Sequence, residues 1–266
     1  MDLTTVIQGL KAKSQKYQEQ QLLDGKESTG ANFKCNKCKD LGFIEVGINT
    51  YRKCECRLRE ELLQRFKNAG VNLEEIKDIE EYETYNSLSG KGKLITEKFI
   101  NEYKDIKKDR KNGITFMGQA GSGKTFLSLF IAKKLIEEGF NVRYMSYLEA
   151  IRELKSLTLN RDEYEKKFNE YINADVLIID DLFKNKILNG QLKNGLTEAD
   201  LNHIMPVINQ RYINHKSMVI STECRANQLI ELDGATNGRI LEASKYTVTF
   251  DKGCNYRLIN LLERGI

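Results

Sequence analysis

The residues from Gly118 to Thr125 have the types and the spacing of a phosphate-binding loop. Their sequence is GQAGSGKT, and they lie between an apolar run that includes Ile114 and Phe116 and a helix-like run that starts at Phe126. Glycines let the backbone turn tightly with its N–H groups pointing inward, which suits the binding of phosphate oxygens. The pattern predicts a site for ATP with Mg²⁺, although a loop of this kind can also bind a nucleotide without hydrolysing it.

Two side chains of this loop carry most of its chemistry. We expect Lys124 to reach the β- and γ-phosphates and the Thr125 hydroxyl to ligate magnesium. The other expected contacts come from neighbouring residues of the same segment. The full set of expected nucleotide-binding residues here is Gly118, Gln119, Ala120, Gly121, Ser122, Gly123, Lys124, Thr125 and Phe126.

An acidic motif follows an apolar run later in the chain. Residues 174–182 have the sequence ADVLIIDDL, in which Val176 to Ile179 are typical of a strand buried on both faces. In P-loop enzymes an aspartate at this point holds magnesium, and the next acid can polarise the attacking water. We therefore expect Asp180 to hold magnesium and Asp181 to orient water, so that both are candidate catalytic residues together with Lys124. The alternative is a solvated loop after a core strand.

Four of the six cysteines lie in one short region, which indicates a metal site. Cys35 and Cys38 belong to the sequence CNKC, and Cys54 and Cys56 belong to CEC. Two close pairs can present four thiolates, which complete the closed tetrahedral shell of structural zinc. The residues between the pairs, 41–53, alternate enough to form a small hairpin. Disulfides are the alternative, but they are disfavoured in a cytoplasmic chain that carries an ATPase motif.

The composition sets broader limits on the chain. It has 266 residues, 40% of them hydrophobic, which suits one medium domain plus a small appendage. No apolar run reaches membrane-spanning length and the N-terminus lacks the apolar core of a secretion signal, so we expect a cytoplasmic protein without membrane contact. The net charge of +4 is only mildly basic. Any nucleic-acid contact must therefore come from local patches.

Changes of pattern along the chain predict four segments. Residues 1–30 form an amphipathic helix and a tether, and residues 31–68 form the zinc-binding module. Residues 69–93 form a linker, and residues 94–266 form the ATPase domain. The basic excess of the cysteine-containing segment is compatible with a phosphate backbone as partner and equally with a solvated surface.

Strands that alternate with helices predict the architecture of the last segment. NVRYMSY, SMVIST and YTVTF join the two apolar runs described above as expected strands of a five-stranded parallel sheet, which is flanked by helices in an α/β fold. Residues 196–215 are expected to form a helix that Pro206 kinks or interrupts. Only 16 residues follow Phe250, which is too few for a separate helical lid over the nucleotide.

The order of the motifs resembles the DnaC/DnaI group of bacterial and phage helicase loaders, which are AAA+ ATPases related to the transposition helper IstB. The shared features are the cysteine module followed by GQAGSGKT, LIIDDL, NQRY, MVIST, NGRI and GCNYR. The resemblance spans nearly the whole chain and is strongest from about residue 112 to residue 258. It implies a P-loop AAA+ core without a C-terminal lid.

The resemblance also implies roles for residues nearer the C-terminus. Arg239 matches the arginine that in this family reaches into the nucleotide site of the neighbouring subunit, which makes it a further candidate catalytic residue. Arg257 matches a second, sensor-like arginine. Ser221 and Thr222 end the fourth strand where the family has a polar sensor of the γ-phosphate, and we expect Thr222 to contact the nucleotide. Glu223 stands where the family has asparagine, which departs from the pattern.

The function that the resemblance implies is ATP-dependent loading of a hexameric DnaB-type replicative helicase onto single-stranded DNA. The ATPase domain would self-associate, the N-terminal helix and the zinc module would grip the helicase, and the helices at 147–172 would face DNA. Hydrolysis is expected to be slow and to depend on a partner or on DNA, because Asp181 is shorter than the glutamate of many AAA+ ATPases. Two alternatives remain: an IstB-like transposition helper that acts on duplex DNA, and a zinc adaptor that nucleotide switches without significant turnover.

Overall fold

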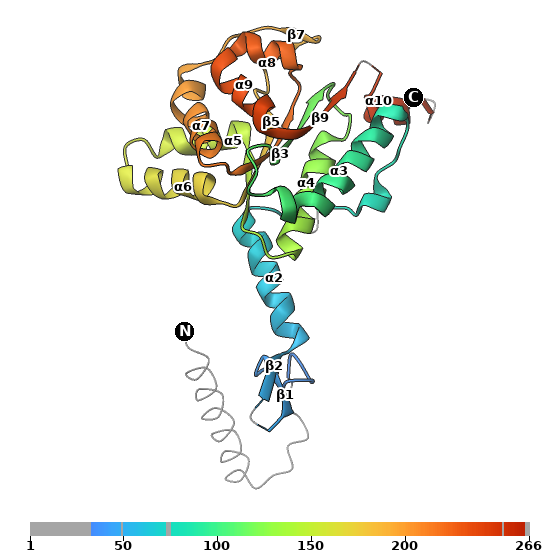
Figure 1. Ribbon diagram of the computed structural model, residues 1–266, viewed down its shortest axis with the longest axis vertical. Helices are drawn as coiled ribbons and strands as arrows, with labels where there is room; N and C mark the ends of the chain where they lie inside the picture. The colour runs from blue at the N-terminus through green and yellow to red at the C-terminus, as the bar shows by residue number, and fades with distance from the viewer. Residues whose placement is uncertain (1–32, 49, 73–75, 252, 264–266) are drawn as a thin grey trace. The chain divides into compact units, whose positions relative to one another are not determined.

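The computed structural model describes residues 33–48, 50–72, 76–251 and 253–263 (Figure 1). The predicted helix and tether within residues 1–30 lie outside the described residues. The chain divides into two compact units, residues 1–62 and residues 63–266, which are treated separately below. No helix in the part that the structure describes is long and apolar enough to cross a membrane.

The first unit contains the predicted hairpin. Strands β1 (Phe43–Gly47) and β2 (Thr50–Lys53) pair antiparallel, and helix α2 (Glu55–Ala69) begins directly after them. The Cys54 N–H donates a hydrogen bond of 2.9 Å to the Gly42 carbonyl, which extends the pairing beyond the open end of the hairpin. The hairpin thereby brings the chain before β1 close to the chain after β2, as a site built from two cysteine pairs requires.

The second unit is built on the five-stranded parallel sheet that the sequence predicts. Its strand order is β4-β5-β8-β3-β9, and all neighbouring strands run parallel. The strands are β3 (Gly113–Gly118), β4 (Val142–Ser146), β5 (Val176–Leu182), β8 (Ser217–Thr222) and β9 (Ser244–Phe250). The three central strands are almost entirely buried, because helices cover both faces of a parallel sheet, and this explains their continuous apolar runs.

Helices form a layer on each face of this sheet (Figure 1). One layer holds α3 and α4, and the opposite layer holds α5, α6, α7 and α9, whose apolar residues form one core with alternate residues of the central strands. The helices of this unit after α2 are α3 (Ser87–Ile106), α4 (Lys124–Glu137), α5 (Tyr147–Ser156), α6 (Arg161–Asn173), α7 (Met205–Ile213), α8 (Ala226–Leu232), α9 (Gly234–Ala243) and α10 (Tyr256–Glu263).

Helix α3 begins before residue 94, where the ATPase domain was predicted to start. Asn86 caps it, because its side chain accepts a hydrogen bond of 2.8 Å from the Ser89 N–H while its own N–H donates to the Ser89 hydroxyl at 3.0 Å. Gly92 lies inside the helix where a Cβ atom would come within 2.9 Å of the Phe250 ring. A glycine that weakens the helix pattern in the sequence is thus required by close packing.

The segment between β5 and α7 contains short elements that the sequence analysis did not predict. Strands β6 (Ile187–Leu188) and β7 (Gln191–Leu192) form a small hairpin. Its turn residues Asn189 and Gly190 both have positive φ, which is the geometry that the Asn-Gly pair favours. The helix predicted for residues 196–215 begins as a single π-helical turn, η3 (Asp200–Ile204), which leads into α7.

The position of Pro206 explains the change from η3 to α7. Pro206 lies in the first turn of α7, where a missing N–H costs little because the turn before it already has altered hydrogen bonding. Pro206 therefore lies just after a change of helix type, in a segment that stays helical where the sequence predicted a kink or an interruption.

Candidate functional site

A cavity of about 600 Å³ lies at the carboxyl end of β3 and contains most of the predicted nucleotide-binding residues. Ligands of open parallel sheets bind at this edge, where the strands end and the following loops begin. The predicted residues that line the cavity are Ala120, Gly121, Ser122, Gly123, Lys124, Thr125, Phe126, Asp181 and Arg257. Gly118 and Gln119 precede them at the end of β3, where their carbonyl groups accept hydrogen bonds from Lys124.

The glycines of the loop are required by its conformation. Gly121 and Gly123 have φ values of +74° and +89°, which side chains rarely allow. A Cβ atom on Gly121 would also lie 2.2 Å from the Asn255 amide oxygen, and one on Gly123 would lie 2.7 Å from the Tyr82 ring. The loop is therefore enclosed by residues from before α3 and from after β9.

Lys124 begins α4 and is only 5% exposed. Its Nζ atom donates hydrogen bonds to the carbonyl oxygens of Gly118 and Gln119, at 2.9 and 2.7 Å. Burial lowers the pKa of Lys124 to about 8. Because both acceptors are neutral carbonyls, the ammonium charge inside the loop remains available to a phosphate group.

Asp180 lies next to Thr125, as a shared magnesium site requires. The Thr125 hydroxyl donates a hydrogen bond of 3.0 Å to Oδ1 of Asp180, and the Tyr144 hydroxyl donates one of 2.9 Å to Oδ2. Ser221 donates a third hydrogen bond, to Oδ1. These donors come from α4, β4 and β8, so the carboxylate is fixed by three elements around the end of β5.

Asp181 points into the cavity because the strand bulges at this position. The register of β5 against β8 shifts between Ile179 and Leu182, and Asp181 has a φ of +55°. The Asp181 N–H donates a hydrogen bond of 2.9 Å to the Ser221 hydroxyl, while its carboxylate forms an ion pair with Lys184. The hydrogen bond from Lys184 to Asp181 raises the pKa of Lys184. Two adjacent acids thus occupy different surroundings, one enclosed and one facing the cavity.

The structure places the predicted nucleotide contact Thr222 beside the cavity lining rather than in it. This side chain is buried, donates a hydrogen bond of 2.7 Å to the Leu182 carbonyl and accepts one of 3.1 Å from the Cys224 N–H. Thr222 is not among the described residues that line the cavity. Alternate residues of a strand point to opposite faces, and Ser221 is the one whose hydroxyl contacts Asp180. Glu223, which follows the strand, does line the cavity.

The two predicted arginines lie in different places. Arg257 lines the cavity from the first turn of α10. Arg239 is absent from the described lining of this cavity and lies on α9, where its guanidinium donates a hydrogen bond of 2.7 Å to the Asn209 side chain. It also lies 5.7 Å from the centre of the Tyr212 ring. Within one chain, Arg239 is therefore held on the surface of α7 and α9.

Three tyrosines of the cavity were missed by the sequence analysis. Tyr82 and Tyr85 lie in the segment predicted as a linker, yet both line the cavity, together with Tyr256. The Tyr85 hydroxyl donates a hydrogen bond of 2.6 Å to the Cys254 carbonyl, and its ring lies 5.3 Å from that of Tyr256. The only signal in the sequence was two tyrosines within the acidic stretch DIEEYETYN.

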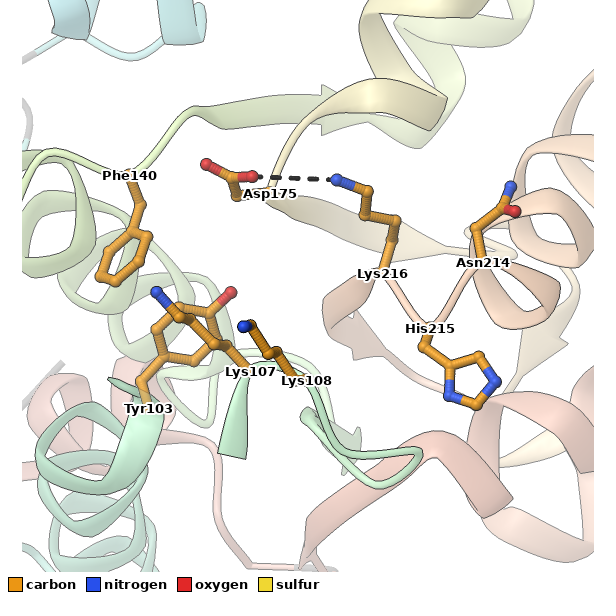
Figure 2. Close-up of a pocket in the computed structure, with 8 residues that line it drawn as sticks. All are labelled: Tyr103, Lys107, Lys108, Phe140, Asp175, Asn214, His215 and Lys216. Atoms are coloured by element: carbon orange, nitrogen blue, oxygen red, sulfur yellow. Dashed lines mark ion pairs between the residues drawn. The ribbon is translucent and has the colours of Figure 1, made fainter. Parts of the chain in front are cut away.

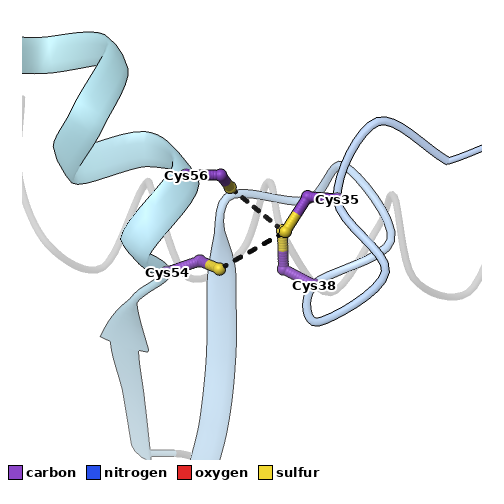
Figure 3. Close-up of side chains that lie close together, drawn as sticks. All are labelled: Cys35, Cys38, Cys54 and Cys56. Carbon is purple, nitrogen blue, oxygen red and sulfur yellow. Dashed lines mark hydrogen bonds between the residues drawn. The ribbon is translucent and has the colours of Figure 1, made fainter.

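The four predicted cysteine ligands lie together in the first unit (Figure 3). All four sulfur atoms lie within 4.8 Å of one another. The Sγ atoms of Cys35 and Cys54 are 3.7 Å apart, and those of Cys38 and Cys56 are 3.4 Å apart. A tetrahedral zinc site with Zn–S bonds of about 2.3 Å needs sulfur atoms roughly 3.8 Å apart, so the donor set fits such an ion. The Gly42 N–H donates to the Cys38 sulfur at 3.3 Å, a bond that would support a thiolate ligand.

Comparisons with known proteins also indicate that the chain binds ATP. Residues 50–231 match the family model of the IstB-like ATP binding protein. The phage-like element PBSX protein XkdC of Bacillus subtilis (strain 168) is 32% identical over 249 residues, which cover 89% of this chain and 89% of that protein.

Solved structures share the fold at lower sequence identity. The crystal structure of the DnaC helicase loader has a TM-score of 0.55 and 22% identity, and covers 70% of this chain and 99% of that one. The crystal structure of DnaI has a TM-score of 0.54 and 18% identity, and covers 72% of this chain and 93% of that one. The second unit therefore has the fold of P-loop AAA+ ATPases.

We expect ATP affinity to fall above a pH of about 8. Below this pH the Lys124 ammonium is already charged, whereas above it nucleotide binding must first protonate the amine. The dissociation constant for a fluorescent ATP analogue should be flat below about pH 8 and rise by up to about tenfold per pH unit above it. In a Lys124→Arg variant the side chain stays charged, so its affinity should not vary over this range. A flat profile for the unsubstituted chain up to about pH 9.5 would contradict the lowered pKa.

Proposed function

Because the chain belongs to the family of IstB-like ATP-binding proteins and is an ATPase, we propose that it loads a hexameric DnaB-type replicative helicase onto single-stranded DNA. Its AAA+ fold, shared with the DnaC helicase loader and with DnaI, supports a role in DNA replication. The observation that carries the proposal is that the charged residues expected to act on ATP lie on two different surfaces of the chain. Lys124 and Asp181 line the cavity, whereas Arg239 is held on another surface of the same chain.

The residues of the cavity suit binding and hydrolysis of ATP. Lys124 would contact the β- and γ-phosphates from the start of α4, and Thr125 and Asp180 would hold the magnesium ion that neutralises phosphate charge. Asp181 would orient water from the bulge of β5. The hydrogen bond between Thr125 and Asp180 supports this assignment, because it already places both expected ligands of the ion side by side.

Two features of the cavity support slow hydrolysis that depends on a partner. Asp181 is engaged by Lys184, so the carboxylate that would orient water is already paired with a cation. The site also needs a positive charge opposite Lys124 to stabilise the transition state, and Arg239 would supply it from a second copy of the chain. Nucleotide would then promote self-association, and assembly would be the output of ATP binding.

Arg239 should act on the nucleotide site of a neighbouring chain. We expect Arg239→Ala to lower ATP turnover by about a thousandfold while ATP affinity is kept, since an arginine of this kind acts in the transition state. Lys124→Ala should lack turnover because it loses a phosphate contact. A mixture of the two variants should recover part of the activity, because one chain supplies Lys124 and the other supplies Arg239. Turnover is measured by phosphate release at high protein concentration.

A matched control is Arg110→Ala, which removes another arginine that contacts Tyr212. This variant should retain turnover. Failure of the mixture to recover any activity, with both variants folded and able to associate, would contradict a site shared between chains.

We propose that the cysteine cluster holds one structural zinc ion. Four thiolates leave no open coordination position, so the ion would stabilise the hairpin and the start of α2 rather than take part in hydrolysis. By the family resemblance, this module and the N-terminal helix would grip the helicase. The compact arrangement of the four sulfur atoms supports the assignment.

Elemental analysis should find about one zinc ion per chain. Cys54→Ser should lose the zinc, because Cys54 is a buried member of the cluster and serine is a poor zinc ligand. Cys254→Ser, which changes a cysteine outside the cluster, should keep it. Zinc retained at full stoichiometry in the Cys54 variant would contradict the assignment.

Complex formation with a replicative helicase tests the main proposal. Native mass spectrometry of the chain mixed with a cognate helicase should show several copies of the chain per helicase hexamer in the presence of ATP and Mg²⁺. Lys124→Ala should reduce the number of bound copies, because assembly depends on ATP. The absence of a complex under every nucleotide condition, with the helicase hexamer intact, would overturn the loader function.

One alternative is favoured by a specific observation. The family model that matches residues 50–231 is that of IstB-like proteins, which supports a transposition helper that acts on duplex DNA. ATP-dependent filaments on duplex DNA, seen by electron microscopy without any helicase complex, would favour this alternative.

A further inference from the structure

A second cavity lies at the amino ends of the strands, away from the carboxyl ends where the nucleotide cavity lies. Figure 2 shows the residues that line it. It has a volume of about 430 Å³ and lies where β5 and β8 begin. Its described lining residues are Tyr103, Lys107, Lys108, Phe140, Asp175, Asn214, His215 and Lys216. None of them was singled out by the sequence analysis or is used by the ATPase site.

The charge of this cavity is predominantly positive. Lys107 and Lys108 lie at the end of α3 and are exposed, and Lys216 lies across from them beside Asp175 (Figure 2). The Lys216 Nζ atom is 3.8 Å from the Asp175 carboxylate, which is the single acidic group among the described lining residues. That carboxylate also accepts a hydrogen bond of 3.0 Å from the Asn141 N–H. One carboxylate therefore faces three lysines.

A buried arginine, Arg211, adds a further positive charge beside the cavity. Arg211 has no exposed surface, and burial lowers its pKa to about 9, so it remains charged at neutral pH. Its guanidinium donates hydrogen bonds to the backbone carbonyls of Asp175, at 3.3 Å, and Ser217, at 2.6 Å. It also donates hydrogen bonds to the backbone carbonyls of Tyr171, Ile172 and Ala174. These carbonyls solvate the cation without neutralising it, and the cation lies next to Asp175, which lines the cavity.

The walls of the cavity are held in place by Asn112. This side chain is 1% exposed and donates hydrogen bonds to the carbonyls of Lys107, at 3.1 Å, and His215, at 2.8 Å. It thereby ties the end of α3 to the turn between α7 and β8. His215 has a φ of +51°, a conformation that costs energy for a residue with a side chain. The two backbone segments that carry the lysines are thus held together by the hydrogen bonds of Asn112.

An aromatic surface lies beside the lysines. The Tyr103 and Phe140 rings meet edge to face with their centres 5.0 Å apart, and the Lys107 ammonium lies 4.9 Å from the centre of the Phe140 ring. Phe140 remains partly exposed. Positive groups beside an exposed ring are the combination that binds the phosphates and bases of single strands.

We propose that this cavity binds the phosphate groups of a single-stranded nucleic acid, as a site separate from the nucleotide cavity. Lys107, Lys108 and Lys216 pair with successive backbone phosphates, and the partly exposed face of Phe140 receives a base. The proposal deepens the proposed function and rests on it, because it names a surface through which the assembled chains contact DNA.

The test compares two triple substitutions in the full chain. The cavity variant is Lys107→Ala/Lys108→Ala/Lys216→Ala, and the charge-matched control is Lys91→Ala/Lys193→Ala/Lys245→Ala, which removes three exposed lysines outside both cavities. Binding of a labelled oligothymidylate is measured by fluorescence anisotropy over a series of salt concentrations, with and without ATP. Binding of labelled polyglutamate is measured in the same way. A third chain, Lys107→Arg/Lys108→Arg/Lys216→Arg, keeps the charge of the cavity.

The cavity variant should bind the oligonucleotide about tenfold more weakly at low salt, and its slope of log affinity against log salt should fall by about 2, since each phosphate contact contributes about 0.7. The control triple and the arginine triple should have an oligonucleotide affinity and a salt slope close to those of the unsubstituted chain. ATP affinity should be the same in all four chains, because the nucleotide cavity is intact.

Three outcomes would overturn the assignment. Equal losses in the cavity and control triples would mean that only overall charge matters, and the helicase-loading function would stand. Loss of polyglutamate binding with unchanged oligonucleotide binding would identify an acidic protein as the ligand. Failure of the unsubstituted chain to bind any oligonucleotide, with or without ATP, would reject the proposed DNA contact as a whole and this site with it.

Discussion

The enclosed carboxylate of Asp180 is the interaction around which the nucleotide cavity is built. A carboxylate that is 6% exposed loses most of its hydration, which costs several kcal/mol unless hydrogen bonds replace the water. Thr125, Tyr144 and Ser221 supply those bonds from three different elements. The start of α4, the end of β4 and the end of β8 must therefore meet at the end of β5. These bonds join β5 to β4 and β8, the two strands that flank it in the sheet.

The bulge in β5 lets two neighbouring acids have different environments. In a regular strand, adjacent side chains would point to opposite faces, and one acid would be buried against a helix layer. The register shift and the positive φ of Asp181 turn its carboxylate toward the cavity instead. Ser221 stabilises both parts of this arrangement, because its hydroxyl donates to Asp180 and accepts from the Asp181 N–H. A hydroxyl at the end of β8 thus stabilises two neighbouring residues of β5.

Features that depend on a local sequence pattern could be predicted from the sequence. Features that depend on contacts between distant segments could not. The five strands and the phosphate loop follow from continuous apolar runs and from glycine spacing, and the structure confirms the strands. Which of Ser221 and Thr222 faces the site depends on register with β5, which one strand alone does not specify. Tyr82 and Tyr85 were missed for a related reason. Their contacts are with Ser122 and Cys254, which are distant in sequence.

The walls of the nucleotide cavity connect segments from distant parts of the chain. Tyr82 and Tyr85 contact the Ser122 carbonyl, while Tyr85 also reaches the Cys254 carbonyl after β9. A nucleotide in the cavity would touch both segments and so favour their joint ordering around the loop. Tyr82, Tyr85 and Cys254 all belong to the second unit, so these contacts close the nucleotide cavity within that unit.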